Sequence, residues 1–183
     1  MNETEINRII EFWFSDQVKP LHFKSTAAFD QQIKDRYLQL WQRARRGELD
    51  PWKASKEGCL ALVILLDQFP LNMFRDQPEA FATEQQSREV AGFAIDAGFD
   101  QQMPATWQVF LYLPFMHSES LSDQDKSVFL FESAGLQDNL KWAQHHRELI
   151  RRFGRFPHRN QALGRVSTAD EMNYLKSKHA FRG

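Results

Sequence analysis

The chain of 183 residues is 42% hydrophobic and 26% charged, and its formal net charge at pH 7 is −1. This composition excludes an intrinsically disordered chain, and the near-zero net charge argues against a basic surface field that would attract DNA or an anionic membrane. The length allows one substantial core, so we expect a single domain over residues 1–183, and the 16 Phe and 5 Trp predict that large rings build that core.

Helix signals dominate the chain, and it shows no alternation typical of strands and hairpins. Apolar residues recur at steps of three and four, which predicts an all-α fold of about seven or eight helices. The predicted helices cover residues 4–14, Ser25 to Gly47, Trp52 to about Gln68, Thr83 to about Gly98, Pro104 to His117, 123–134, Asp138 to Phe153, and a last helix from Thr168. The proline-punctuated stretch FPLNMFRDQPEAFAT is expected to be a connection.

A short side chain with an oxygen atom can cap the start of a helix, because the oxygen accepts a hydrogen bond from one of the first free N–H groups. The predicted N-caps are Ser25, Asp50, Thr83, Ser122 and Asp138. Thr168 and Glu171 have the spacing of a capping box, and Gly154 suits the position after a helix end. Pro114 should kink or end its helix, because its ring removes a hydrogen bond.

The sequence also bears on location. The single cysteine, Cys59, can form no internal disulfide, which fits a reducing compartment. The stretch MNETEINRIIEFWF begins acidic and lacks the basic region of a signal peptide, and the longest apolar run, CLALVILL, is shorter than the about 20 residues that span a bilayer. We expect a cytoplasmic bacterial protein that does not enter a membrane.

Three separated stretches resemble one known family. They are LVILLDQFPLNMFRDQPEAFAT at 62–83, LYLPFMHSE at 111–119 and RFGRFPHRNQALGRVST at 152–168. Together they look like DUF924, a bacterial family of unassigned function whose helical members are similar to tetratricopeptide-repeat folds. The resemblance implies tetratricopeptide-like antiparallel helix pairs, although Leu71 departs from the arginine that the family often has after DQFP. It also implies a shared centre, formed by Asp67, Gln68, Arg75, His117, Glu119, His146, Arg155, His158, Arg159 and Asn160.

The stretch RFGRFPHRN carries cations and aromatic rings in what reads as a link between two helices. Its apolar residues should anchor it, and Pro157 fixes one backbone angle, so we expect a pinned segment. Arginines in such a segment have two common roles. They bond carbonyl oxygens at helix ends or pair with a carboxylate, or they bind an anionic ligand through the same planar fork of donors.

His117 and Glu119 follow an almost wholly apolar helix. The histidine could be a general base oriented by a carboxylate, a metal ligand together with Glu119, His146 or His158, or a side chain that closes the helix C-terminus. No spacing of a known metal site occurs, and we expect neither a metal nor another cofactor. Asp67 ends a buried helix, where the dipole disfavours a carboxylate, so we expect Arg75 or an arginine of 155–159 as its partner.

The leading hypothesis is that these polar segments form a pocket for a small molecule bearing phosphate or carboxylate, with hydrolase-type catalysis as a further possibility. The catalytic candidates are His117, Glu119 and His158. The ligand-binding candidates are Asp67, Gln68, Arg75, His146, Arg155, Arg159 and Asn160.

Two alternatives belong to other classes. A helical interaction module could bind a peptide or protein partner through exposed aromatic anchors such as Trp13, Trp41 and Trp52. The basic, aromatic-bearing run 141–165 has the composition of a groove for single-stranded nucleic acid, although the net charge of −1 speaks against nucleic acid as the partner.

Overall fold

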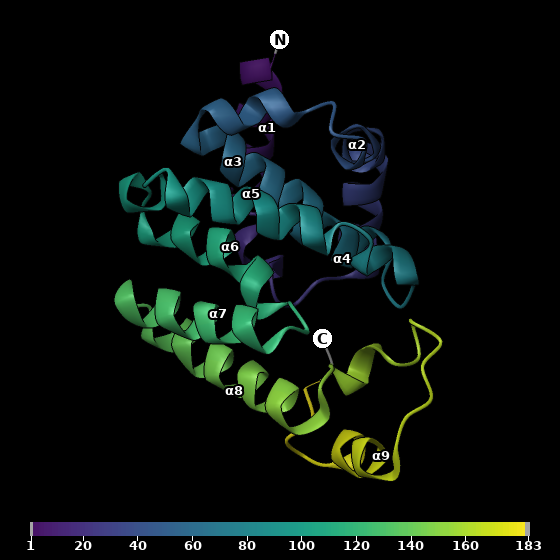
Figure 1. Ribbon diagram of the computed structural model, residues 1–183. Helices are drawn as coiled ribbons and strands as arrows, with labels where there is room; N and C mark the ends of the chain where they lie inside the picture. Colours follow the sequence, from purple (N-terminus) through teal and green to yellow (C-terminus); the bar gives the residue numbers. More distant parts are fainter. Residues whose placement is uncertain (1, 182–183) are drawn as a thin grey trace. The chain divides into compact units, whose positions relative to one another are not determined.

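The computed structural model describes residues 2–181, and within these residues it contains helices and no strands (Figure 1). The all-α prediction is confirmed. By internal contacts the chain divides into two compact units. Unit 1 comprises the chain up to Arg75 together with Glu79–Pro114, and unit 2 comprises Asp76–Pro78 and the chain from Phe115 onward. The single domain over residues 1–183 stays a prediction. Among the described residues, no helix is long and apolar enough to cross a membrane.

Unit 1 contains the first five α-helices and most of the sixth. They are α1 (Asn2–Trp13), α2 (Ala27–Arg45), α3 (Lys56–Val63), α4 (Phe69–Met73), α5 (Glu84–Asp96) and α6 (Ala105–Met116). Short helical turns lie between them, at η1 (Lys19–Leu21), η2 (Asp50–Ala54), η3 (Ile64–Gln68), η4 (Pro78–Phe81) and η5 (Asp100–Gln102), of which η3 is a π turn.

The core of unit 1 is built on rings, as the composition predicts. Trp13 is fully buried and its ring lies 5.5 Å from that of Phe69, in an edge-on arrangement with an angle of 68° between the planes. Trp41 and Trp52 are only 3% and 2% exposed. The three tryptophans considered as anchors for a partner are therefore core residues, and that part of the interaction hypothesis is wrong.

The buried run CLALVILL is helical, and the helix extends further than predicted, through η3 into α4. Pro70 has no N–H, which leaves the carbonyl of Leu66 without its usual helical donor. Thr83 Oγ1 donates to that carbonyl at 2.6 Å, and Trp41 Nε1 donates to Thr83 Oγ1 at 3.1 Å. The stretch Phe69–Met73, predicted to belong to a connection, stays helical because a hydroxyl distant in sequence replaces the missing donor.

Two helices in unit 1 begin later in the chain than their predicted N-caps indicate. Thr26, not Ser25, caps α2 by accepting from the N–H of Phe29 at 3.2 Å. Asp50 begins the separate turn η2, and Ser55 caps α3 instead. Thr83 precedes α5 as expected, but its hydroxyl is committed to Leu66 and makes no cap bond.

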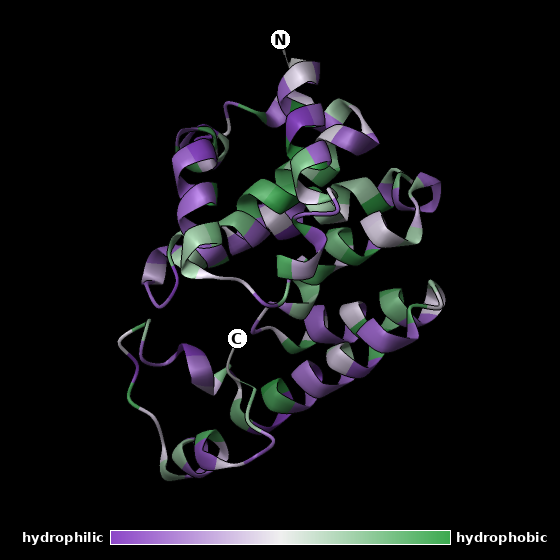
Figure 2. Ribbon diagram, turned by 180° about the vertical axis from the view of Figure 1, so that it is seen from behind, coloured by the Kyte–Doolittle hydropathy of each residue, from purple (hydrophilic) through white to green (hydrophobic). Residues whose placement is uncertain are grey.

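Unit 2 contains the remaining helices. They are α7 (Leu121–Ser133), α8 (Gln137–Phe153), the short turn η6 (Pro157–Arg159) and α9 (Ala169–Lys176). Helices α7 and α8 pack side by side (Figure 1). Figure 2 shows hydrophilic and hydrophobic residues alternating along α8, the pattern of a helix with one buried face.

A small apolar cluster holds the second half of unit 2 together. Its buried members are Leu149, Ile150, Phe156 and Tyr174, with Phe153, Leu175, Ala180 and Phe181 packed against them. This cluster joins α8, the segment after it and α9. The stretch RFGRFPHRN is therefore pinned by Phe156, which is completely buried.

The helix ends of unit 2 follow the sequence signals in part. Gly154 ends α8 with a left-handed φ of 70°, and the Thr168–Glu171 capping box is present. The N-cap of α7 is Ser120 and that of α8 is Leu136, so Ser122 and Asp138 were wrong as caps. The helix that contains Pro114 continues past it and ends at Met116.

Candidate functional site

The turn after α6 is closed by side chains from other parts of unit 2. Gln124 is fully buried, and its amide nitrogen donates to the carbonyls of Met116 at 2.6 Å and Ser118 at 2.7 Å. Arg159 Nη2 donates to the carbonyl of His117 at 2.8 Å. Carbonyl groups at a helix end lack helical partners, so Arg159 has one of the structural roles that an arginine in a pinned segment can take. The segments around 117 and 159 meet here.

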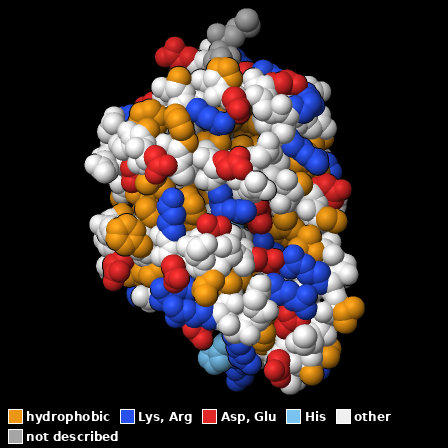
Figure 3. Space-filling model, in the orientation of Figure 1, with side chains coloured by type: hydrophobic (Ala, Val, Ile, Leu, Met, Phe, Trp, Pro, Cys, Tyr) orange, Lys and Arg blue, Asp and Glu red, His pale blue; other side chains and the backbone are white. Residues whose placement is uncertain are grey.

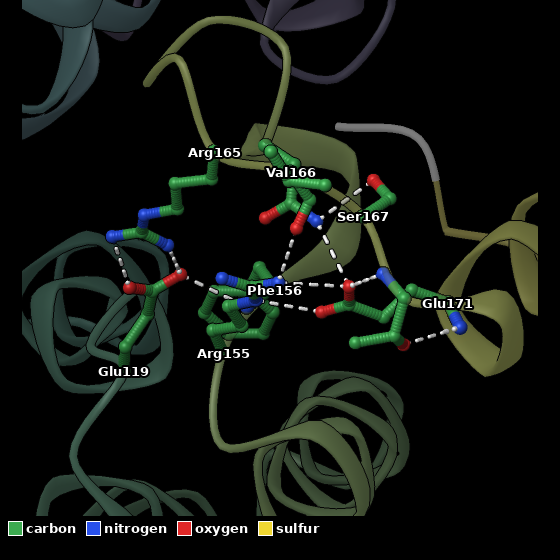
Figure 4. Close-up of polar contacts among 9 residues, drawn as sticks. Glu119, Arg155, Phe156, Arg165, Val166, Ser167 and Glu171 are labelled. Atoms are coloured by element: carbon green, nitrogen blue, oxygen red, sulfur yellow. Dashed lines mark hydrogen bonds and ion pairs between the residues drawn. The ribbon is translucent and has the colours of Figure 1, made fainter.

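Glu119 joins the same turn to the segment that follows α8. Its two carboxylate oxygens accept from Arg165 Nη1 and Nη2 at 2.9 and 2.8 Å, and the Phe156 N–H donates to Oε1 at 2.9 Å (Figure 4). Burial alone would raise the pKa of Glu119, but the bonds from Arg165 and Phe156 hold that pKa below its ordinary value. Glu119 is thus an ionised anchor whose donors come from the protein itself.

A second carboxylate, Glu171, organises the far side of Phe156. Arg155 donates to it through Nε at 2.6 Å and Nη2 at 2.9 Å (Figure 4). Asn160 Nδ2 and the Thr168 N–H donate to the same carboxylate at 3.2 and 2.7 Å. These bonds, first of all that from Arg155, lower the pKa of Glu171 to about 2. The sequence identified Glu171 only as part of a capping box, although it is also the partner of Arg155.

Two imidazoles pack against Phe156, and we call His146 and His158 the histidine pair. Their rings lie 5.4 and 5.6 Å from that of Phe156. His146 is 4% exposed, and its Nδ1 lies 2.8 Å from the carbonyl oxygen of Trp142. His158 Nδ1 is buried and has no hydrogen-bond partner among the described residues.

Burial lowers the pKa of both members of the histidine pair to about 3. For His146, the hydrogen bond to the Trp142 carbonyl offsets only part of this lowering. For His158, the positive charge of Arg159 lowers the pKa further. Both imidazoles are therefore neutral at neutral pH. A general base works best when its pKa lies near the working pH, and the pKa of His158 lies well below that.

Unit 2 brings seven of the predicted residues into one connected set of contacts. They are His117, Glu119, His146, Arg155, His158, Arg159 and Asn160. Unit 1 holds the other three. In unit 1, Gln68 Nε2 donates to Asp67 Oδ2 at 2.6 Å, and Arg75 donates to both carboxylate oxygens of Asp30, at 2.8 and 3.3 Å. The pairing of Asp67 with an arginine stays a prediction.

A surface hollow of about 380 Å³ lies beside the N-terminus of α9. It is lined by Arg152, Phe153, Arg155, Thr168, Asp170 and Glu171. The Arg152 guanidinium lies 4.6 Å from the centre of the Phe153 ring, and it pairs with no carboxylate among the described residues. Sequence reasoning missed Arg152 as a site residue, because the sequence does not show which arginines of the basic run lack a carboxylate partner.

Metal and thiol chemistry can be compared with the side chains present. Within residues 2–181, no group of three or more His, Cys, Asp or Glu is arranged so that it could hold a metal ion. Burial raises the pKa of the Cys59 thiol to about 11, which keeps it protonated and makes it a poor nucleophile.

Comparisons with known proteins give two matches. A family model described as "Bacterial protein of unknown function (DUF924)" matches residues 9–179. The solved structure of a protein of unknown function from Agrobacterium tumefaciens is 39% identical, covers 96% of this chain and 99% of that chain, and superimposes with a TM-score of 0.90. The comparison with curated proteins gives no match. The two matches extend over nearly the whole chain, and neither carries an activity.

Proposed function

We propose that this chain, which belongs to DUF924, a bacterial family of unknown function, binds a small molecule bearing phosphate or carboxylate in the hollow beside α9. The observation that carries this proposal is Arg152, which lines the hollow and has no described carboxylate partner. Arg155 and Arg165 are each held in two bonds by a glutamate of unit 2. Their forks are therefore largely occupied, whereas that of Arg152 is available to a ligand.

The start of α9 supplies further donors for an anion. The first N–H groups of a helix have no partner within it, and the helix dipole favours negative charge at this end. The capping box uses the N–H groups of Thr168 and Glu171. The donors that remain for an anion are therefore the N–H groups of Ala169 and Asp170, beside the hollow that Thr168 and Asp170 line. Glu171 also lies there, but its charge is compensated by Arg155 at 2.6 Å. Asp170 is exposed at the rim and opposes an anion, so the proposal is for a ligand with one or two negative charges rather than a polyanion.

The proposal is confined to binding. Hydrolase-type catalysis at His117, Glu119 or His158 would need a group that exchanges protons near neutral pH. Glu119 is ionised and held by Arg165, and the pKa of His158 is about 3. These two groups can position neighbouring residues, and neither changes its protonation state near neutral pH.

The test is a thermal-shift screen of phosphorylated and carboxylated metabolites, followed by calorimetry on any compound that stabilises the protein. A ligand at 100 times its Kd adds about 2.7 kcal/mol, which shifts Tm by about 5 to 10 °C for a chain of this size. We expect Arg152→Gln to weaken binding about tenfold or more, since a charge-assisted bond contributes about 1.5 to 3 kcal/mol.

The matched control is Arg151→Gln. Arg151 is the neighbouring exposed arginine of α8, and its guanidinium lies 3.7 Å from Asp125. This variant removes the same charge from the same helix end but outside the hollow. A ligand whose Kd is unchanged by Arg152→Gln, or raised equally by both variants, contradicts the proposed site.

We propose a helical interaction module as the second candidate. Its support is Trp142 on α8, which is 54% exposed, together with the side-by-side packing of α7 and α8 that a tetratricopeptide-like helix pair requires. Trp142 replaces the three buried tryptophans as the candidate anchor. A partner captured from lysate by the wild-type chain and lost with Trp142→Ser supports this function, and equal capture by both excludes Trp142 as its anchor.

We also propose a cytoplasmic location, supported by the single cysteine, which is free and buried.

A further inference from the structure

The segment that follows α9 places an aromatic ring on the histidine pair. The Phe181 ring lies 4.5 Å from that of His146 and 5.0 Å from that of His158, both in edge-on geometry. It also lies 6.2 Å from the ring of the exposed Trp142. Phe156 forms the other side of the pair. One aromatic side chain thus fills a position bounded by two neutral imidazoles and a second phenyl ring.

One of the two imidazoles that contact the Phe181 ring has a polar atom without a described hydrogen-bond partner. His158 Nδ1 is buried without a described hydrogen-bond partner, and Phe181 offers it only carbon and hydrogen. A buried polar group left without a partner is unfavourable. A ring of the same size that carried a hydroxyl or an N–H could keep the ring contacts and also bond this nitrogen.

Apart from these ring contacts, few hydrogen bonds hold the backbone of the Phe181 segment. Its N–H donates to the Tyr174 hydroxyl at 2.8 Å, and the Ala180 N–H donates to the carbonyl of Ser177 at 3.3 Å. The Phe181 side chain is only half-buried. A segment anchored by so few bonds opens more readily than the helices beneath it.

From these contacts we infer that the histidine pair and Phe156 form a binding site for a single aromatic ring with a hydroxyl or N–H group, and that Phe181 competes for it. The ligand class is a small molecule with a phenol or indole ring. The site is separate from the anion hollow, since none of its residues lines that hollow. Failure of the anion proposal therefore leaves this inference standing, and the reverse also holds.

The experiment compares phenol with toluene, which has the same ring and no hydroxyl. Binding is measured by ligand-observed NMR and by titration of selectively ¹⁵N-histidine-labelled protein, for the wild type and Phe181→Ala. Removing the Phe181 ring should allow millimolar binding of phenol to the variant. The wild type, in which Phe181 occupies the site, should bind phenol more weakly. Phenol should bind the variant about fivefold more tightly than toluene, which corresponds to about 1 kcal/mol for one hydrogen bond. The His158 Nδ1 resonance should shift on titration with phenol only.

A second variant identifies the nitrogen involved. Adding His158→Phe to Phe181→Ala should remove the preference for phenol while ring binding remains. The ratio of phenol to toluene affinity is measured on Phe181→Ala alone, so it does not depend on how well the double variant folds. Equal affinity for the two probes, or no binding of either, overturns the inference.

Discussion

Replacing Glu171 by glutamine tests whether this carboxylate holds the second half of unit 2 together. The substitution keeps the shape of the side chain and removes its charge. Glu171 is 2% exposed and accepts from Arg155, Asn160 and the Thr168 N–H. In the glutamine variant one of the two acceptor oxygens becomes an NH₂ group, which faces donors instead of accepting from them.

The cost follows from the pKa of Glu171. A fall from 4.5 to about 2 corresponds to about 3 kcal/mol, since one pKa unit corresponds to about 1.4 kcal/mol. The Arg155 side chain is 28% exposed, and solvent screening reduces the effect, so we expect a loss of about 2 kcal/mol. A carboxyl whose pKa is lowered by folding stabilises the protein fully above pH 4.5. That contribution declines as the pH falls from 4.5 towards 2.

The assay is urea unfolding at pH 7 of the wild type, Glu171→Gln and a matched control. The control is Asp138→Asn on α8, where a carboxylate with 96% of its side chain exposed pairs with Lys141 at 3.1 Å. Exposed pairs contribute little, so the control should lose less than about 0.5 kcal/mol. If Glu171→Gln is no less stable than Asp138→Asn, the reasoning that treats Glu171 as a structural centre is refuted.

Three further substitutions probe other parts of the molecule. Thr83→Val should cost about 2 to 3 kcal/mol in urea unfolding, because it strands the Leu66 carbonyl and the Trp41 N–H, whereas Thr83→Ser should stay close to the wild type. The free energy of unfolding should fall as the pH drops from 6.5 towards 3, because both histidines bind a proton in the unfolded chain but stay neutral in the folded one. Each imidazole contributes a slope of up to about 1.4 kcal/mol per pH unit, so His158→Gln should make the free energy depend less on pH. Glu119→Gln should cost about 1 to 2 kcal/mol by weakening the bonds from Arg165, and an unchanged unfolding midpoint contradicts its anchoring role.

The fold could be predicted where the signal is local. The left-handed glycine at 154 and the capping box at Thr168 depend on residues within one turn of each other, and both are present. The N-cap of α2 shows the limit. Ser25 and Thr26 are equally good caps in sequence, and the choice is made by Asp30, which accepts the Ser25 hydroxyl and leaves Thr26 to accept from the helix.

The extent of the central helix could not be read from the sequence for a related reason. Pro70 predicts a break, since it removes a donor from the helix. The hydroxyl that restores that donor belongs to Thr83, 17 residues from Leu66 in the chain. Local propensity therefore gave the wrong answer for Phe69–Met73, because the compensating bond is a tertiary one.

The partners of the polar side chains were equally hidden. Glu119 and Arg165 lie 46 residues apart in the chain, and Arg155 and Glu171 lie 16 apart. A list of charged residues does not say which of several carboxylates each arginine will meet. The segments that converge in unit 2 could be named from their motifs, but the division into paired and available arginines needed coordinates.

That division changes what the basic run 141–165 can bind. Carboxylates from other parts of unit 2 compensate most of its charge, and Figure 3 shows acidic side chains interleaved with the basic ones on the face it presents. The pairs are Arg147 and Arg151 with Asp125, Arg155 with Glu171, Arg165 with Glu119, and Lys141 with Asp138. Binding to a nucleic-acid backbone needs several cations that neutralise successive phosphates. A run whose cations are mostly paired, with Arg152 in a hollow of limited size, suits a single anionic group instead.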